Sequence, residues 1–197
     1  MTRSELKLSE LYLRVLSLFT NGFDREYYIR EVQRLLNVSS KTAFTLLSDL
    51  EKQGILEATT KGKIKVYRLR EHKLVNDYLI MAELYKKILF LEKNNIVKEI
   101  LEKISPYING IGIIFGSYAK GTQKKDSDLD TFIVGKYKRK EIEQISEAYG
   151  IKISIKNYPF SLFKKSLRDK DDVLIKEILN NHIIFKKIEE FIEIVRK

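Results

Sequence analysis

Two short motifs between residues 116 and 130 carry the side chains that could do chemistry. Gly116 and Ser117 end one apolar stretch, and Asp128 and Asp130 flank the start of the next. A glycine at a strand-to-helix junction lets a ligand approach the backbone, where free N–H groups and a serine hydroxyl favour a phosphate. On a strand, residues i and i+2 lie on one face about 7 Å apart, a carboxylate spacing that suits Mg²⁺. A phosphate cradle opposite a divalent-cation site predicts binding of a nucleoside triphosphate.

The acidic segment 126–130 has a simpler interpretation, since an acidic turn can merely cap a strand. The Gly-Ser motif that precedes it argues against this interpretation, because the two motifs together form a site that neither forms alone. Lys120 lies in the loop between them, where its ammonium group could neutralise phosphate charge or could simply be solvated. The candidate phosphate-binding residues are therefore Gly116, Ser117 and Lys120, and the candidate catalytic and metal-binding residues are Asp128 and Asp130.

The chain resembles the DNA polymerase beta-like nucleotidyltransferase superfamily, above all its minimal prokaryotic members. The resemblance rests on Gly-Ser, a spacer of about ten residues and then Asp-x-Asp at a strand. The resemblance covers approximately residues 94–190. It implies that Gly116 and Ser117 hold a triphosphate. It also implies that Asp128 and Asp130 bind Mg²⁺ or Mn²⁺, which activates the attacking oxygen and stabilises the leaving pyrophosphate.

The sequence departs from the superfamily at one point, the third carboxylate that active members carry on a neighbouring strand. The matching strand here is expected at 151–156, with its isoleucines facing the core and Lys152, Ser154 and Lys156 on the other face. A lysine at that place would repel divalent cations and could instead meet a phosphate. The departure argues against two-metal catalysis and leaves nucleotide binding or single-metal binding open. A loop could supply the missing acid from Asp169, Asp171 or Asp172.

The first 70 residues predict a small helical unit that ends in a hairpin. Apolar residues spaced by three and four predict helices near 8–20 and 29–36, and the second helix ends at Asn37, a residue that tolerates the left-handed conformation. Ser39 offers an N-cap for a third helix. The pair Lys61-Gly62 is typical of a turn between two strands.

The segment 29–69 resembles a winged helix-turn-helix of the kind found in prokaryotic transcription regulators. The resemblance implies that the third helix enters the major groove of double-stranded DNA while lysines of the wing contact phosphates. Winged helices also serve as protein-interaction or dimerisation modules, and that alternative stays open. The candidate DNA-contacting residues are Ser40, Lys41, Thr45 and Ser48 on the helix and Lys61, Lys63 and Lys65 on the wing.

These patterns predict a two-domain α+β protein. We expect a winged helix-turn-helix domain at 1–71, a helical linker or dimerisation region at 72–105, and a nucleotidyltransferase-like domain at 106–197. The last of these is expected to be a small mixed β-sheet with flanking helices.

The composition excludes several other chemistries. The 197 residues include no cysteine and only two histidines, which rules out thiol catalysis and a disulfide scaffold and argues against a histidine-built metal site. A formal net charge of +10 favours an anionic partner. Charged residues interrupt the most apolar stretch, 74–91, so we expect a cytoplasmic protein with no membrane partner.

The expected function is that of a DNA-binding winged-helix protein fused to a minimal nucleotidyltransferase domain. With Mg²⁺, that domain would transfer a nucleoside monophosphate from a nucleoside triphosphate to an acceptor hydroxyl. The acceptor hydroxyl could belong to a protein. The alternative is a transcription regulator whose degenerate nucleotidyltransferase domain only senses nucleotide or dimerises. Modification of a small-molecule hydroxyl is a third hypothesis, which the fused DNA-binding module disfavours. A homodimer is expected because winged helices commonly bind palindromic sites in pairs.

Overall fold

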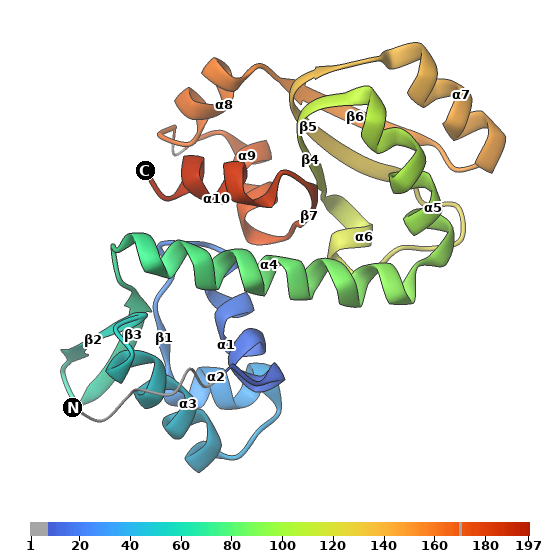
Figure 1. Ribbon diagram of the computed structural model, residues 1–197. Helices are drawn as coiled ribbons and strands as arrows, with labels where there is room; N and C mark the ends of the chain where they lie inside the picture. The colour runs from blue at the N-terminus through green and yellow to red at the C-terminus, as the bar shows by residue number, and fades with distance from the viewer. Residues whose placement is uncertain (1–7, 170) are drawn as a thin grey trace. The chain divides into compact units, whose positions relative to one another are not determined.

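The computed structural model of the chain describes residues 8–169 and 171–197, so the first seven residues of the predicted N-terminal domain lie outside the described residues. The chain divides into two compact units, Met1–Ala82 and Glu83–Lys197. Each unit combines helices with one small sheet (Figure 1), which confirms the predicted mixed α+β class. Among the described residues, no helix has the length and apolar character needed to cross a membrane.

The first unit consists of helices packed beside a three-stranded antiparallel sheet with strand order β1-β3-β2. Its core includes Val15, Phe19 and Leu47, which are fully buried, and Phe19 meets the ring of Tyr27 edge to face at 4.9 Å. Its elements are α1 (Glu10–Thr20), β1 (Tyr27–Tyr28), α2 (Ile29–Leu36), α3 (Ser40–Lys52), β2 (Leu56–Lys61), β3 (Ile64–Leu69) and the first part of α4 (Lys73–Lys93).

The local signals that predicted α2 and α3 are confirmed. Asn37 ends α2 in the left-handed conformation with φ at 53°. The hydroxyl oxygen of Ser39 accepts a hydrogen bond from the backbone N–H of Thr42 at 3.0 Å and so caps α3. The predicted hairpin is present, with Lys61 paired to Ile64 across the two residues of its turn.

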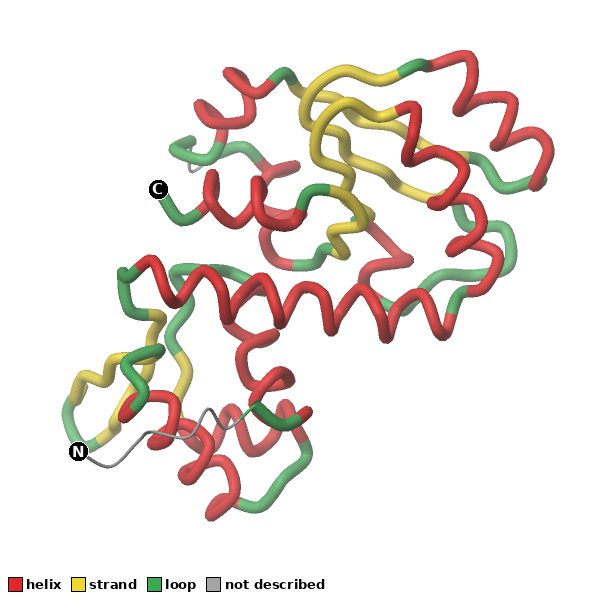
Figure 2. The backbone as a smooth tube through the Cα atoms, in the orientation of Figure 1, coloured by secondary structure: helices red, strands yellow, loops and turns green. Residues whose placement is uncertain are grey.

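The second unit is built on a four-stranded sheet with strand order β6-β5-β4-β7, in which β5 and β6 run parallel and the other pairs run antiparallel. Figure 2 shows the helices that alternate with these strands along the chain. The elements after α4 are α5 (Asn95–Ile104), the 3-10 turn η1 (Ser105–Tyr107), β4 (Ile108–Ile114), α6 (Gly116–Lys120), β5 (Leu129–Tyr137), α7 (Arg139–Tyr149), β6 (Ile153–Tyr158), α8 (Phe160–Ser166), α9 (Val173–Asn180), β7 (Ile183–Lys186) and α10 (Ile188–Val195).

Side chains of β5 alternate between the two faces of this sheet. Leu129 and Ile133 belong to the core that α5 and α7 complete on one face. Phe132 points to the other face, where its ring lies 5.9 Å from that of Phe163 in α8, which in turn stacks on Phe191 of α10 at 6.1 Å. Because the side-chain period of a strand is two, the aspartates that flank Leu129 share the face of Phe132 and lie away from the α5–α7 core.

Candidate functional site

The carboxylate of Asp130 lies directly over the first residue of α6. Gly116 has φ at +68°, and a Cβ atom built on it would come within 2.2 Å of Oδ2 of Asp130. The backbone N–H of Phe115 also donates a hydrogen bond to the carbonyl of Asp130 at 3.0 Å. Only glycine therefore fits at this position, and the two predicted motifs meet at one place. Ser117 follows Gly116 on α6 and is partly exposed.

Asp128 and Asp130 stand on either side of Leu129, as the sequence predicts. Leu129 is fully buried, whereas both aspartates are partly exposed. Burial raises the pKa of Asp130, a hydrogen bond from Ser154 partly offsets that effect, and the carboxylate of Asp128 raises the pKa further. The site thus holds two carboxylates that repel each other when both are ionised.

Strand β6 contributes a serine to this face, and the residue just before the strand contributes a lysine. The parallel register places Ser154 opposite Asp130, and Nζ of Lys152 lies 2.5 Å from Oδ2 of Asp128. The hydrogen bond to Asp128 raises the pKa of Lys152. Ile153 and Ile155 pack against the core on the opposite face, so the strand presents no acid beside the aspartates, as predicted.

A carboxylate that sequence reasoning missed lies on α9. Glu177 is close enough to Asp130 to raise the pKa of that carboxyl further, and its Oε1 lies 2.6 Å from Nζ of Lys120. The pair holds the predicted phosphate-binding lysine beside the aspartates. Glu177 stands in no motif with them, and only the packing of α9 brings it there.

Two of the three acids considered as loop-borne substitutes, Asp169 and Asp172, accept hydrogen bonds from nearby backbone groups. Asp172 caps α9 by accepting a hydrogen bond from the backbone N–H of Ile175 at 3.0 Å. Asp169 accepts one from the backbone N–H of Asp171 at 2.9 Å. These contacts stabilise the loop before α9 and the start of that helix.

The donors around Asp128 and Asp130 do not fit a two-metal centre. Two carboxylates are hard oxygen ligands of the kind that Mg²⁺ prefers, but the opposing position on β6 is Ser154 and the ammonium of Lys152 already contacts Asp128. Across residues 8–169 and 171–197, no three His, Cys, Asp or Glu side chains converge closely enough to hold a metal ion.

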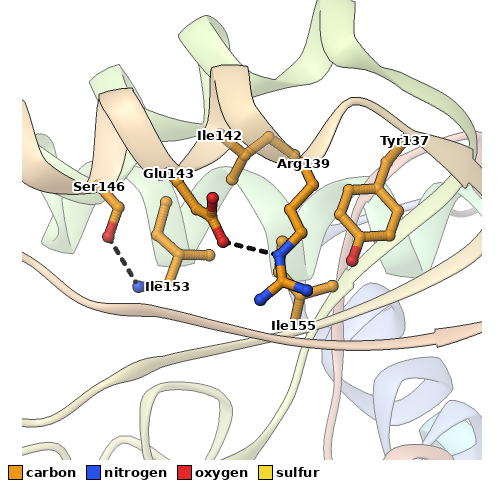
Figure 3. Close-up of a pocket in the computed structure, with 7 residues that line it drawn as sticks. All are labelled: Tyr137, Arg139, Ile142, Glu143, Ser146, Ile153 and Ile155. Atoms are coloured by element: carbon orange, nitrogen blue, oxygen red, sulfur yellow. Dashed lines mark hydrogen bonds and ion pairs between the residues drawn. The ribbon is translucent and has the colours of Figure 1, made fainter.

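Two cavities of the second unit are not lined by Asp128 or Asp130. One, of about 150 Å³, is lined by residues of α7, β5 and β6 (Figure 3). There Ser146 accepts a hydrogen bond from the N–H of Ile153 and so links α7 to β6, whereas the pair of Arg139 and Glu143 lies within α7. The other, of about 450 Å³, is lined by α4, α6 and β7, with Lys86, Lys93 and Lys120 at its wall.

The predicted DNA-contacting residues of the first unit lie on the surface of α3 and at the hairpin. On α3, Ser40, Lys41 and Thr45 are exposed and Ser48 is partly exposed. On the hairpin, Lys63 is exposed, while Lys61 pairs with Glu26 at 2.5 Å and Lys65 pairs with Glu51 at 2.7 Å. Exposed pairs of this kind contribute about 0–1 kcal/mol, so a phosphate can compete for either lysine.

Three solved structures are similar to this chain. The adhesin competence repressor from Streptococcus pyogenes is 18% identical, covers 52% of this chain and 72% of its own, and gives a TM-score of 0.38. A toxin-antitoxin solved with AMP-PNP is 17% identical; the match covers 52% of this chain and 82% of that one, with a TM-score of 0.34. The archaeal chromatin protein TrmBL2 is 16% identical; the match covers 89% of this chain and 71% of that one, with a TM-score of 0.29.

No curated protein matches the chain. The family model described as nucleotidyltransferase domain, in contrast, matches residues 93–195, more than half of the chain. The matched residues include Gly116, Ser117, Asp128 and Asp130, which agrees with the resemblance seen in the sequence. On this match, the chain belongs to the nucleotidyltransferase domain family.

Proposed function

We propose that this chain is a DNA-binding regulator whose nucleotidyltransferase domain binds a nucleoside triphosphate beside Asp128 and Asp130. The observation that carries the proposal is the contact between Gly116 and Asp130, because it joins the two predicted motifs into one site. The ammonium groups of Lys120 and Lys152 border the same site, each held by a carboxylate. Charge-assisted hydrogen bonds from such groups favour phosphate oxygens.

Two glycines of the chain provide a matched test of this site. Gly116 and Gly121 both have φ at +68°, so alanine is strained at either position. At Gly116 the added Cβ meets the carboxylate of Asp130, whereas at Gly121 nothing lies within 4 Å of it. In calorimetric titration with each of ATP, GTP, CTP and UTP plus Mg²⁺, we expect Gly116→Ala to weaken binding at least about tenfold and Gly121→Ala about twofold or less.

Thermal unfolding of the two variants serves as the control, since equal melting temperatures exclude a general loss of fold. If Gly116→Ala bound the triphosphates as tightly as the wild type does, the contact between Gly116 and Asp130 would play no part in binding. Absence of triphosphate binding by the wild-type chain would contradict the proposed function as a whole.

A second candidate function is transfer of the nucleoside monophosphate to an acceptor hydroxyl on a protein, with Mg²⁺ or Mn²⁺. The presence of both aspartates on one face favours it. Labelled triphosphate should then mark an acceptor, and Asp128→Ala or Asp130→Ala should abolish the labelling. Ser154 opposite Asp130 and Lys152 on Asp128 favour binding without transfer. Triphosphate binding without labelling selects the first candidate.

For the first unit we propose a winged helix-turn-helix that binds double-stranded DNA. The succession of α2, a tight turn, α3 and the β2–β3 hairpin supports this proposal. The exposed polar side chains of α3 and the hairpin lysines would contact the groove and the phosphates. Binding as a homodimer on a palindromic site completes the proposal.

A further inference from the structure

Beside the two aspartates, the chain has a serine where the family pattern has a third acid, and a lysine two residues before it. Ser154 faces Asp130 in the register of β5 and β6 and donates a hydrogen bond to its carboxylate. Two residues earlier on the same face, Lys152 contacts Asp128 at 2.5 Å. The strand is anchored at this point, because the N–H of Leu129 donates a hydrogen bond to the carbonyl of Lys152 at 2.8 Å.

A triphosphate that approaches Asp128 and Asp130 brings negative charge to negative charge. The interaction between such charges is strong where solvent is partly excluded, so a cation must lie between them. In two-metal enzymes, the metal ions play this part. Here Lys152 already neutralises Asp128, and its side chain is 76% exposed, so phosphate oxygens can reach the ammonium without displacing other protein atoms.

We propose that the ammonium group of Lys152 takes the place of a divalent cation, so that the domain binds a nucleoside triphosphate largely independently of Mg²⁺. The proposal rests on the proposed function, since it specifies how the same site holds its ligand. Ser154, which stands where the family has its third acid, then holds the carboxylate of Asp130 through a hydrogen bond. Lys152 is then the residue that determines whether the site requires a metal.

Lys156 provides the matched control for a test of Lys152. It lies on the same face of β6 and is exposed, but its register partner is Phe132 rather than an aspartate. Each of the four ribonucleoside triphosphates is titrated by calorimetry into the wild-type chain, Lys152→Met and Lys156→Met, in Mg²⁺ and in EDTA. We expect EDTA to weaken binding by about threefold or less in the wild type and in Lys156→Met.

In Lys152→Met we expect EDTA to weaken binding at least about tenfold and Mg²⁺ to restore it, because the metal can then reach Asp128. Equal behaviour of Lys152→Met and Lys156→Met, or loss of wild-type binding in EDTA, would overturn the inference. Absence of wild-type binding in both buffers would instead overturn the proposed function, and this inference with it.

A metal titration without nucleotide tests the same inference independently. The double variant Lys152→Val with Ser154→Asp removes the ammonium and supplies the third acid. Free Mn²⁺, followed by electron paramagnetic resonance, should bind this variant at least about tenfold more tightly than it binds the wild type. Lys156→Val should behave as the wild type does. Equal Mn²⁺ affinity of the double variant and the wild type would contradict the role of Lys152, whatever the triphosphate affinity is.

Discussion

At the scale of single residues, the candidate site depends on how closely Asp130 approaches the backbone of Gly116. A carboxylate that would lie 2.2 Å from a Cβ leaves no room for any side chain there. The same carboxylate accepts a hydrogen bond from Ser154 and lies near Glu177. Asp130 therefore joins β5 to α6 and β6, while the carboxylate of Glu177 on α9 raises its pKa.

Glu83 is a second residue whose charge matters, in this case for stability. Its side chain is fully buried, with Oε1 2.8 Å from Nζ of Lys86 and 3.3 Å from Nε2 of His182. Burial alone would raise the pKa of Glu83, but the ammonium of Lys86 and the imidazole of His182 outweigh that effect and lower the pKa to about 2. The carboxylate is therefore ionised in the folded protein.

We expect Glu83→Gln to lower the free energy of unfolding at pH 7 by about 3 kcal/mol, because it removes one charge of a buried pair. A pKa lowered on folding adds stability that is present above about pH 4.5 and is lost as the pH falls toward 2. The wild type should therefore lose stability more steeply than Glu83→Gln over this range. Urea unfolding measures both effects. The control is Glu92→Gln, because Glu92 lies on the same helix and is exposed. Equal stability of the Glu83 and Glu92 variants would show that the pair contributes nothing.

The sequence predicts part of the site because its motifs are close along the chain. Gly116 begins α6 just after β4, and Asp128 and Asp130 flank the first residue of β5, the strand next to β4, so the two motifs are separated by only a short helix and a loop. Glu177 could not be predicted, since its position depends on how α9 packs against the rest of the unit. The partner of Lys152 also required the parallel register of β5 and β6.

At the scale of elements, capping residues predicted helix ends well. Ser39 and Asn37 act through contacts with residues a few positions away, so their effect is local and visible in the sequence. The hairpin lysines illustrate the opposite case. Lys61 and Lys65 pair with Glu26 and Glu51, which stand far from them in sequence, and spacing alone did not indicate those pairs.

The wing leads to a prediction about salt. DNA binding by a surface with two fewer cationic side chains releases fewer counterions. The double variant Lys63→Ala with Lys65→Ala should therefore bind DNA more weakly and reduce the slope of log K against log salt by about 1–2. Lys164→Ala with Lys165→Ala removes the same charge from exposed positions of α8 in the other unit and should leave the slope unchanged. Fluorescence anisotropy on labelled duplex DNA over a range of salt measures both. An unchanged slope in the hairpin variant would exclude the wing from the DNA interface.

At the scale of the whole molecule, the ligands proposed for the two units, DNA and a nucleoside triphosphate, are both anionic. The net charge of +10 agrees with phosphate-bearing ligands for both. The family match lies within residues 93–195 and thus concerns the second unit. The helices and the hairpin of the first unit were predictable from periodicity, caps and turn residues, whereas β1, a strand of two residues, is too short to show a pattern and was not predicted.

Hydrogen–deuterium exchange of the full chain, with and without saturating triphosphate, tests the central claim most directly, because it locates the ligand without altering a residue. Bound triphosphate should slow the exchange of backbone amides in peptides covering 115–131 and 152–156, while peptides of α7 at 139–149 remain unchanged. Unchanged exchange at 115–131 under saturation, or slowing confined to other segments, would contradict a nucleotide site at Gly116 and Asp130.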